Sequence, residues 1–341
     1  MAYTSINKPT DYFNTKLYSG SVSSQSITGV GFQPDWVWIK YRSDIANHHL
    51  YDSVRGVQKR LNSNTTNTEA TSVNNLTSFD SDGFTIGTEN DINESGQTYA
   101  SWNWLASNST ASNTDGSITS TVSANTTSGF SIVSYTGTGS NATVGHGLGA
   151  IPKIVIIKNR DRASGWHVGG DAIGSVNQYL NLNDTNAIDS ATTGFKSFSS
   201  TTFGIGSDTD WNASSESIIA YCFAEKKGFS KFGSYTGNGS TDGPMVYTGF
   251  KPAWIMIKRT DSTHNWSIID SIRSINDGSM EFLLADTNSA EDTDPFYDIV
   301  SNGFKLRDTA LRVNASGGSY IYLAFAESPF TTSTGVPTTA R

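Results

Sequence analysis

A nine-residue pattern occurs three times in this 341-residue chain and constrains its fold more than any other feature. The copies are residues 32–40, 150–158 and 250–258, and in each a proline precedes a lysine by six positions. The positions between proline and lysine are mostly apolar and β-branched or aromatic, which is typical of a buried strand. Self-similarity of this kind indicates a chain built from copies of one unit.

Further markers recur in the same order around each copy. An aromatic residue followed by a glycine-containing turn precedes each copy at Tyr18, Tyr135 and Tyr235. A strand-like run closes each unit at residues 99–106, 218–224 and 320–326. These markers predict the following division of the chain: an N-terminal arm (1–10), repeat 1 (11–107), a Ser/Thr/Asn-rich linker or surface-hugging arm (108–127), repeat 2 (128–227), repeat 3 (228–328) and a C-terminal tail (329–341).

The composition favours strands and turns over helices. Charged residues make up 16% and hydrophobic residues 36% of the chain, while Ser, Thr, Asn and Gly dominate. We therefore expect an all-β protein of three tandem β-sandwich repeats, of jelly-roll or lectin-like type, each about 100 residues long.

The repeated strand has two apolar faces. One parity carries β-branched residues such as Val37 and Ile39, which suit the core of each repeat. The other parity carries large side chains that need a cover. A loop of the same repeat or a neighbouring repeat is one possible cover, and a subunit interface is the other. The candidate interface residues are Trp36, Trp38, Trp254 and Met256.

Two acidic positions recur after the repeated strand. Asp52 and Asp270 each lie twelve residues after the lysine of their copy, so we expect ion pairs of Lys40 with Asp52 and of Lys258 with Asp270, unless these charges are simply solvated. Arg55 also recurs, as Arg273, and the Asp-x-x-Arg spacing indicates an architectural salt bridge. Repeat 2 has Gly170 and Ile173 at these positions.

Aromatic and histidine residues near the strands are candidates for sugar stacking. A packing role is the alternative, because the offsets from the lysine differ between copies. The candidate ligand-binding residues are Trp166, Trp211, Trp266, His167 and His264. The single cysteine, Cys222, is expected to be a small buried strand residue.

The remaining chemistry of the sequence is sparse. No spacing of His, Cys or acidic residues matches a metal site, and no phosphate-cradling loop or catalytic constellation stands out, so we expect no catalytic residue, cofactor or metal. The net charge of −8 is spread evenly, which argues against nucleic-acid binding. We also expect neither a signal peptide nor a membrane-spanning segment.

Four stretches of repeat 1 resemble an uncharacterised repeat domain in predicted virion proteins of marine tailed phages. They are residues 31–40, 50–56, 78–84 and 99–104, and repeat 3 matches as a divergent copy. The resemblance implies a non-enzymatic virion protein, assembled in the host cytoplasm, that forms a tail fibre, a tail-tip part or a capsid decoration. It carries no catalytic residues.

Virion proteins are commonly symmetric oligomers, so we expect contacts with other virion proteins and a homo-oligomer, with a trimer preferred. The alternative function is a receptor-binding protein that recognises host surface carbohydrate. A depolymerase would need a pair of carboxylates, for which the repeats offer no recurring candidate.

Overall fold

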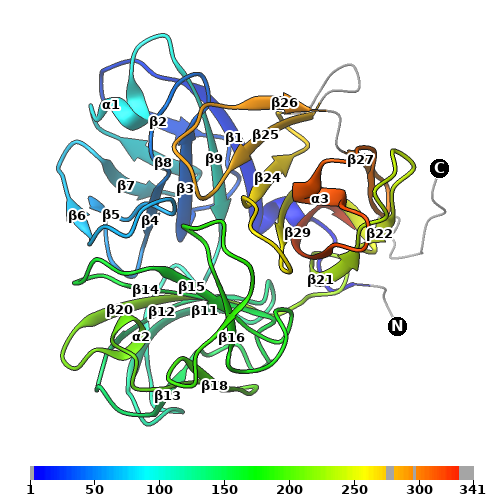
Figure 1. Cartoon of the computed structure of the whole chain (residues 1–341). Helices are drawn as coiled ribbons and strands as arrows, with labels where there is room; N and C mark the ends of the chain where they lie inside the picture. The colour runs from blue at the N-terminus through cyan, green and yellow to red at the C-terminus, as the bar shows by residue number, and fades with distance from the viewer. Residues whose placement is uncertain (1–3, 274–279, 295–296, 330–341) are drawn as a thin grey trace.

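The computed structural model describes residues 4–273, 280–294 and 297–329. The structure is mostly β, with 47% strand and 5% helix, which confirms the all-β class. Its antiparallel sheets group into three regions that follow the three repeats along the chain (Figure 1). No helix among these described residues is long and apolar enough to cross a membrane.

Region 1 corresponds to repeat 1. Its main sheet has the order β1 (Phe13–Ser19), β9 (Thr98–Trp104), β3 (Trp36–Tyr41) and β4 (His49–Asp52). Its small sheet has the order β2 (Gln25–Thr28), β8 (Gly83–Ile86) and β7 (Leu76–Asp80). The remaining elements are the 3-10 turn η1 (Pro9–Asp11), the helix α1 (Asn90–Asn93) and the paired strands β5 (Lys59–Arg60) and β6 (Ala70–Thr71).

Region 2 has the largest sheet. Its strands are, in order, β10 (Ala111–Asn113), β11 (Ser120–Asn125), β12 (Phe130–Thr136), β20 (Ser217–Phe223), β14 (Ile154–Asn159), β15 (Trp166–Gly169), β16 (Gln178–Asn181) and β17 (Asp189–Ser190). The small sheet is β13 (Ala142–Gly145), β19 (Thr202–Ile205) and β18 (Phe195–Phe198), and the helix is α2 (Thr209–Asn212).

Region 3 repeats this plan. Its main sheet has the order β21 (Ser230–Thr236), β29 (Ser319–Pro329), β23 (Phe250–Arg259), β24 (Ser267–Asp270), β25 (Met280–Leu284) and β26 (Asp292–Asp294). The small sheet is β22 (Met245–Tyr247), β28 (Gly303–Leu306) and β27 (Tyr297–Val300), and the helix is α3 (Leu311–Asn314).

The register of the strands shows which positions correspond between regions. The repeated strand pairs with the closing strand so that Lys40 faces Ala100, Lys158 faces Ile219 and Lys258 faces Ile321. The four-strand orders β1-β9-β3-β4, β12-β20-β14-β15 and β21-β29-β23-β24 are therefore equivalent, and residues can be compared position by position.

Each region has a core between its main and small sheets. In region 2, for example, Val155 and Ile157 of the main sheet pack in one cluster with Val144 and Phe203 of the small sheet. The equivalent clusters of regions 1 and 3 contain the same parity of the repeated strand, so the predicted core face is confirmed.

The opposite faces of the three main sheets meet in one common core, which residues of all three regions build. Trp36 of region 1 stacks on Tyr221 of region 2 with ring centroids 4.4 Å apart. Trp104 of region 1 packs edge-on against Trp254 of region 3 at 5.7 Å. Neighbouring repeats therefore cover the second apolar face of the repeated strand.

The segment predicted as a linker contains two strands. β10 and β11 pair with each other and continue the main sheet of region 2, while Ile118 and Val122 pack into its core. The serine, threonine and asparagine residues of these strands, of which Ser120 and Ser123 are buried, gave the segment its linker-like composition. The predicted N-terminal arm is also packed, because Ile6 joins the common core, and most of the predicted tail lies outside the described residues.

Candidate functional site

The most distinctive chemistry of the structure lies along the boundaries between regions, which we call seam 1–2, seam 2–3 and seam 3–1. The three repeated lysines, Lys40, Lys158 and Lys258, are fully buried there. Their ammonium groups donate across the seams to the carbonyl oxygens of Asn288 (3.5 Å), Thr66 (3.1 Å) and Thr185 (2.9 Å), respectively. Region 1 thus reaches region 3, region 2 reaches region 1, and region 3 reaches region 2.

Each of these lysines also donates to at least one carbonyl oxygen of its own repeat. Lys258, for example, donates to the carbonyl of His264 at 2.7 Å. Burial lowers the pKa of all three lysines to about 8. They are therefore mostly protonated at pH 7, and backbone carbonyl oxygens accept hydrogen bonds from the charged ammonium groups.

No ion pair joins Lys40 to Asp52 or Lys258 to Asp270 within the described residues, so these predicted pairs are corrected. The register explains the difference, since Asp52 lies opposite Trp36 and therefore four residues away from Lys40 along β3. Four residues of strand span about 13 Å, which is well beyond hydrogen-bond reach.

The predicted Asp-x-x-Arg salt bridge is confirmed, and at seam 1–2 it extends into a network. Asp52 accepts the Nε hydrogen bond of Arg55, and the Tyr221 hydroxyl of region 2 donates to the same carboxylate at 2.7 Å. Arg55 also pairs with Glu69 at 3.2 Å, and Arg160 of region 2 donates two hydrogen bonds of 2.9 Å to the Glu69 carboxylate. Burial would raise the pKa of Glu69, but hydrogen bonds from Arg160 and the charge of Arg55 lower it below the usual value.

Seam 3–1 has the same network from equivalent residues. Asp270 pairs with Arg273 at 2.5 Å, and the indole of Trp102 donates to this carboxylate at 2.9 Å. Arg273 pairs with Glu291 at 2.8 Å, and Arg42 of region 1 binds Glu291 at 2.7 Å. Both networks are largely buried and connect two regions, so they fix how the regions dock.

Seam 2–3 lacks this network at every equivalent position. In region 2, Gly170, Ile173 and Ile188 stand at the positions of Asp52, Arg55 and Glu69, respectively. In region 3, Thr260 and Leu323 stand at the positions of Arg160 and Tyr221. Because all five positions differ together, no charge of this kind is left buried without a partner. Such an unpaired buried charge would cost several kcal/mol.

The five candidate ligand-binding residues do not gather into one site. Trp166, Trp211 and Trp266 are at most 1% exposed, so their rings are not available to stack a sugar in this structure. Trp166 and Trp266 instead donate across seams 1–2 and 2–3 to the carbonyl oxygens of Asn62 and Asn181, both at 2.8 Å.

The two candidate histidines have different surroundings. His167 stacks on Trp211 with ring centroids 4.5 Å apart, and its Nε2 lies 3.4 Å from Asp210. His264 lies at seam 2–3, where burial, together with the charges of Arg259 and Lys258, lowers its pKa. The packing alternative therefore accounts for the tryptophans and for His167.

The four candidate interface residues are buried inside the chain. Trp36, Trp38, Trp254 and Met256 are 1–2% exposed and belong to the common core. The structure thus covers these faces with neighbouring repeats, which was one of the two alternatives, and leaves none of the four side chains on the surface. Cys222 is also fully buried on β20, as expected.

A repeated buried asparagine was not recognised from the sequence. Asn93, Asn212 and Asn314 are fully buried near the ends of α1, α2 and α3. Asn212, for example, donates to the Gly206 carbonyl at 2.9 Å and accepts from the Thr138 backbone at 2.7 Å. The signal was available, because each asparagine precedes the first residue of the closing run by six positions.

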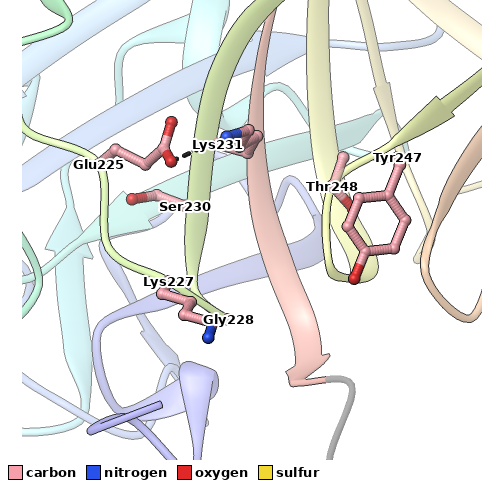
Figure 2. A pocket seen from close by; sticks show the side chains of 7 residues that line it. All are labelled: Glu225, Lys227, Gly228, Ser230, Lys231, Tyr247 and Thr248. Carbon is pink, nitrogen blue, oxygen red and sulfur yellow. Dashed lines mark hydrogen bonds and ion pairs between the residues drawn. The ribbon is translucent and has the colours of Figure 1, made fainter. Parts of the chain in front are cut away.

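A surface cleft of about 450 Å³ lies where the chain passes from region 2 to region 3 (Figure 2). Glu225 pairs with Lys231 at 2.9 Å, and Tyr247, 56% exposed, lines the same cleft. The cleft therefore combines an exposed aromatic ring with an ion pair. Within the described part of the chain, no three or more His, Cys, Asp or Glu side chains lie close enough together to hold a metal ion.

The fold and its seams define an antiparallel β protein in which three copies of one unit close around a common core. Residues 8–329 match the family described as a domain of unknown function (DUF7483). The chain belongs to this family, and the match spans all three repeats. No curated protein matches the sequence.

Proposed function

We propose that the chain is a non-enzymatic structural protein of a phage virion, forming an exposed appendage or a capsid decoration. The observation that carries the proposal is the use of buried polar groups at the seams. The repeated lysines, two indoles and both ion networks bind one region to the next, which suits a rigid building block. The resemblance of residues 31–40, 50–56, 78–84 and 99–104 to a repeat domain of predicted virion proteins supports the same function.

We propose that each region is a β-sandwich of jelly-roll or lectin-like type. We also propose that the chain forms a homo-oligomer or binds other virion proteins through its outer surface, since the faces of Trp36 and Trp254 are internal. The carbohydrate-receptor alternative loses the support of Trp166, Trp211 and Trp266, because all three are buried.

Immunogold electron microscopy of purified phage particles tests the proposal. Antibodies raised against the purified chain are expected to label intact particles, and mass spectrometry of the same particles should detect the chain. Label on fibres or the tail tip would indicate an appendage, and label over the head a decoration. A chain that stays in the soluble lysate and is absent from purified particles would contradict the proposal.

A further inference from the structure

Seam 2–3 has a cavity of about 480 Å³ that is open to solvent, next to the positions where the other two seams hold their ion networks. Ile173 of region 2 and Thr260 of region 3 both line it. Their equivalents at seam 1–2, Arg55 and Arg160, both bind the Glu69 carboxylate. The exchange of two long cationic side chains for isoleucine and threonine thus leaves space in the wall between the regions.

Hydroxyl groups of region 3 form one wall of this cavity. In the register of β21 with β29, Thr236 lies opposite Ser319 and Ser234 lies opposite Ile321, so these four side chains share one face of the sheet. Ile321 belongs to the common core, so this face is turned inward toward region 2. Ser234, Thr236 and Ser319 are exposed to solvent.

The cavity combines these hydroxyl groups with apolar surface and little net charge. Its apolar lining includes Ala172, Ile173 and Ile321, of which the two isoleucines are only 5% and 3% exposed. Among the lining residues, all of which the structure describes, Asp171 carries the single charge, and it forms an ion pair with Lys153. A charged ligand would therefore enter without a free counter-charge, which is unfavourable.

We infer that this cavity binds a neutral polyhydroxylated ligand of the size of a mono- or disaccharide. Serine and threonine hydroxyls both donate and accept hydrogen bonds, as sugar hydroxyls require. The partly exposed Ala172 can contact the C–H face of a sugar ring. The volume lies within the range of small-molecule sites, which occur preferentially at domain boundaries. Such binding requires neither an exposed tryptophan nor a place in a virion.

The test uses the full chain and a defined set of sugars. Glucose, galactose, mannose, N-acetylglucosamine, lactose and cellobiose are screened by saturation-transfer difference NMR, and hits are titrated by calorimetry. We expect at least one sugar to bind with a Kd below 10 mM. Replacing Ser234 and Thr236 together by valine should weaken that binding at least tenfold.

Seam 1–2 provides the matched control. Ser134 and Thr136 are the equivalent residues of β12, and the Ser134→Val/Thr136→Val variant should bind the sugar as the parent chain does. An Ile188→Glu/Thr260→Arg variant, which places in seam 2–3 the residue types of the other seams, should fill the cavity and abolish binding.

Two results would contradict the binding of a sugar in this cavity. Failure of all six sugars to bind the parent chain at 10 mM would overturn the inference. Undiminished binding to the Ser234→Val/Thr236→Val variant would overturn it as well, even if the variant that fills the cavity does not fold.

Discussion

The Tyr221 hydroxyl donates a 2.7 Å hydrogen bond across seam 1–2 to the buried carboxylate of Asp52. At seam 2–3 the equivalent positions are Leu323 and Gly170, so neither the donor nor the acceptor is present. A buried carboxylate without a partner is costly, and so is a buried hydroxyl without an acceptor. A buried donor on one region of a seam therefore requires an acceptor on the other region, and the residues on the two sides differ between seams as pairs.

Removal of the Tyr221 hydroxyl should weaken the fold. In Tyr221→Phe the carboxylate of Asp52 keeps Arg55 but loses its partner from region 2, so we expect the free energy of unfolding to fall by about 1.5–3 kcal/mol, the usual contribution of a hydrogen bond to a charged group. Urea unfolding followed by tryptophan fluorescence measures this change. Tyr247→Phe is the control, because this tyrosine is 56% exposed, and its effect should stay within about 0.5 kcal/mol. Equal effects of the two substitutions would contradict the role given to Tyr221.

Replacement of Arg55 should have a larger effect than the same change at the equivalent position of repeat 2. Arg55→Met leaves Asp52 buried without its counter-charge, which should cost about 3–5 kcal/mol. Ile173→Met exchanges one apolar side chain for another of similar size and should cost less than about 1.5 kcal/mol.

A second substitution separates charge from packing at this site. In Arg55→Met/Asp52→Asn the unpaired charge is gone, so the double variant should be more stable than Arg55→Met alone. Chemical denaturation of Arg55→Met, Asp52→Asn and the double variant gives the comparison. A double variant as unstable as the sum of its two single substitutions would show that the pair does not interact energetically.

The buried lysines predict how stability changes with pH. The folded pKa of each is about 8, below the ordinary value of 10.5, so the unfolded chain binds more protons than the folded chain between these values. The contribution of each lysine to stability therefore rises from about pH 8 toward pH 10.5, by up to about 1.4 kcal/mol per pH unit. Burial raises the pKa of the Cys222 thiol, which acts in the opposite direction above pH 9.

A lysine variant isolates this contribution. Lys258→Met should be less stable than the parent chain at pH 7.5, because three carbonyl oxygens lose a charged donor. Its unfolding free energy should also rise less steeply between pH 8 and pH 9.5 than that of the parent chain, since the Cys222 effect cancels in the comparison. Parallel pH profiles for the two proteins would show that Lys258 does not titrate in this window.

Local patterns were enough to predict the repeats and their strands. The apolar alternation of residues 32–40 and its copies fixed the core face, and three-residue spacing was enough to pair Asp52 with Arg55. Both features depend on residues close in sequence. The strands β10 and β11 were not predicted, because their serine, threonine and asparagine residues resemble a linker in composition.

Contacts between repeats were beyond the sequence for a physical reason. Lys158 and Trp166 bind backbone carbonyl groups of another repeat, and a carbonyl group leaves no residue type by which it could be recognised. The ion pair of Glu69 with Arg160 joins positions 91 residues apart, so only the closed arrangement of the three regions reveals it. The cavity of seam 2–3 could not be predicted either, because it is recognised only when equivalent positions of the three seams are compared in the folded chain.

The backbone of repeat 2 at Gly170 disfavours the aspartate that the other two repeats have at this position. Gly170 has φ +130°, and a Cβ atom there would lie 2.3 Å from the carbonyl oxygen of Lys153. Gly170→Ala should therefore destabilise the protein by at least about 3 kcal/mol, because the backbone of either segment has to move. Gly96 also has a positive φ, +75°, but its Cβ would meet no atom within 4 Å, so Gly96→Ala should cost only about 1 kcal/mol. Thermal and urea unfolding of the two variants compare clash with conformational strain. Equal losses in unfolding free energy would mean that the backbone before β14 moves at little cost and that seam 2–3 could have accommodated an aspartate. The absence of the ion network from this seam would then need another cause.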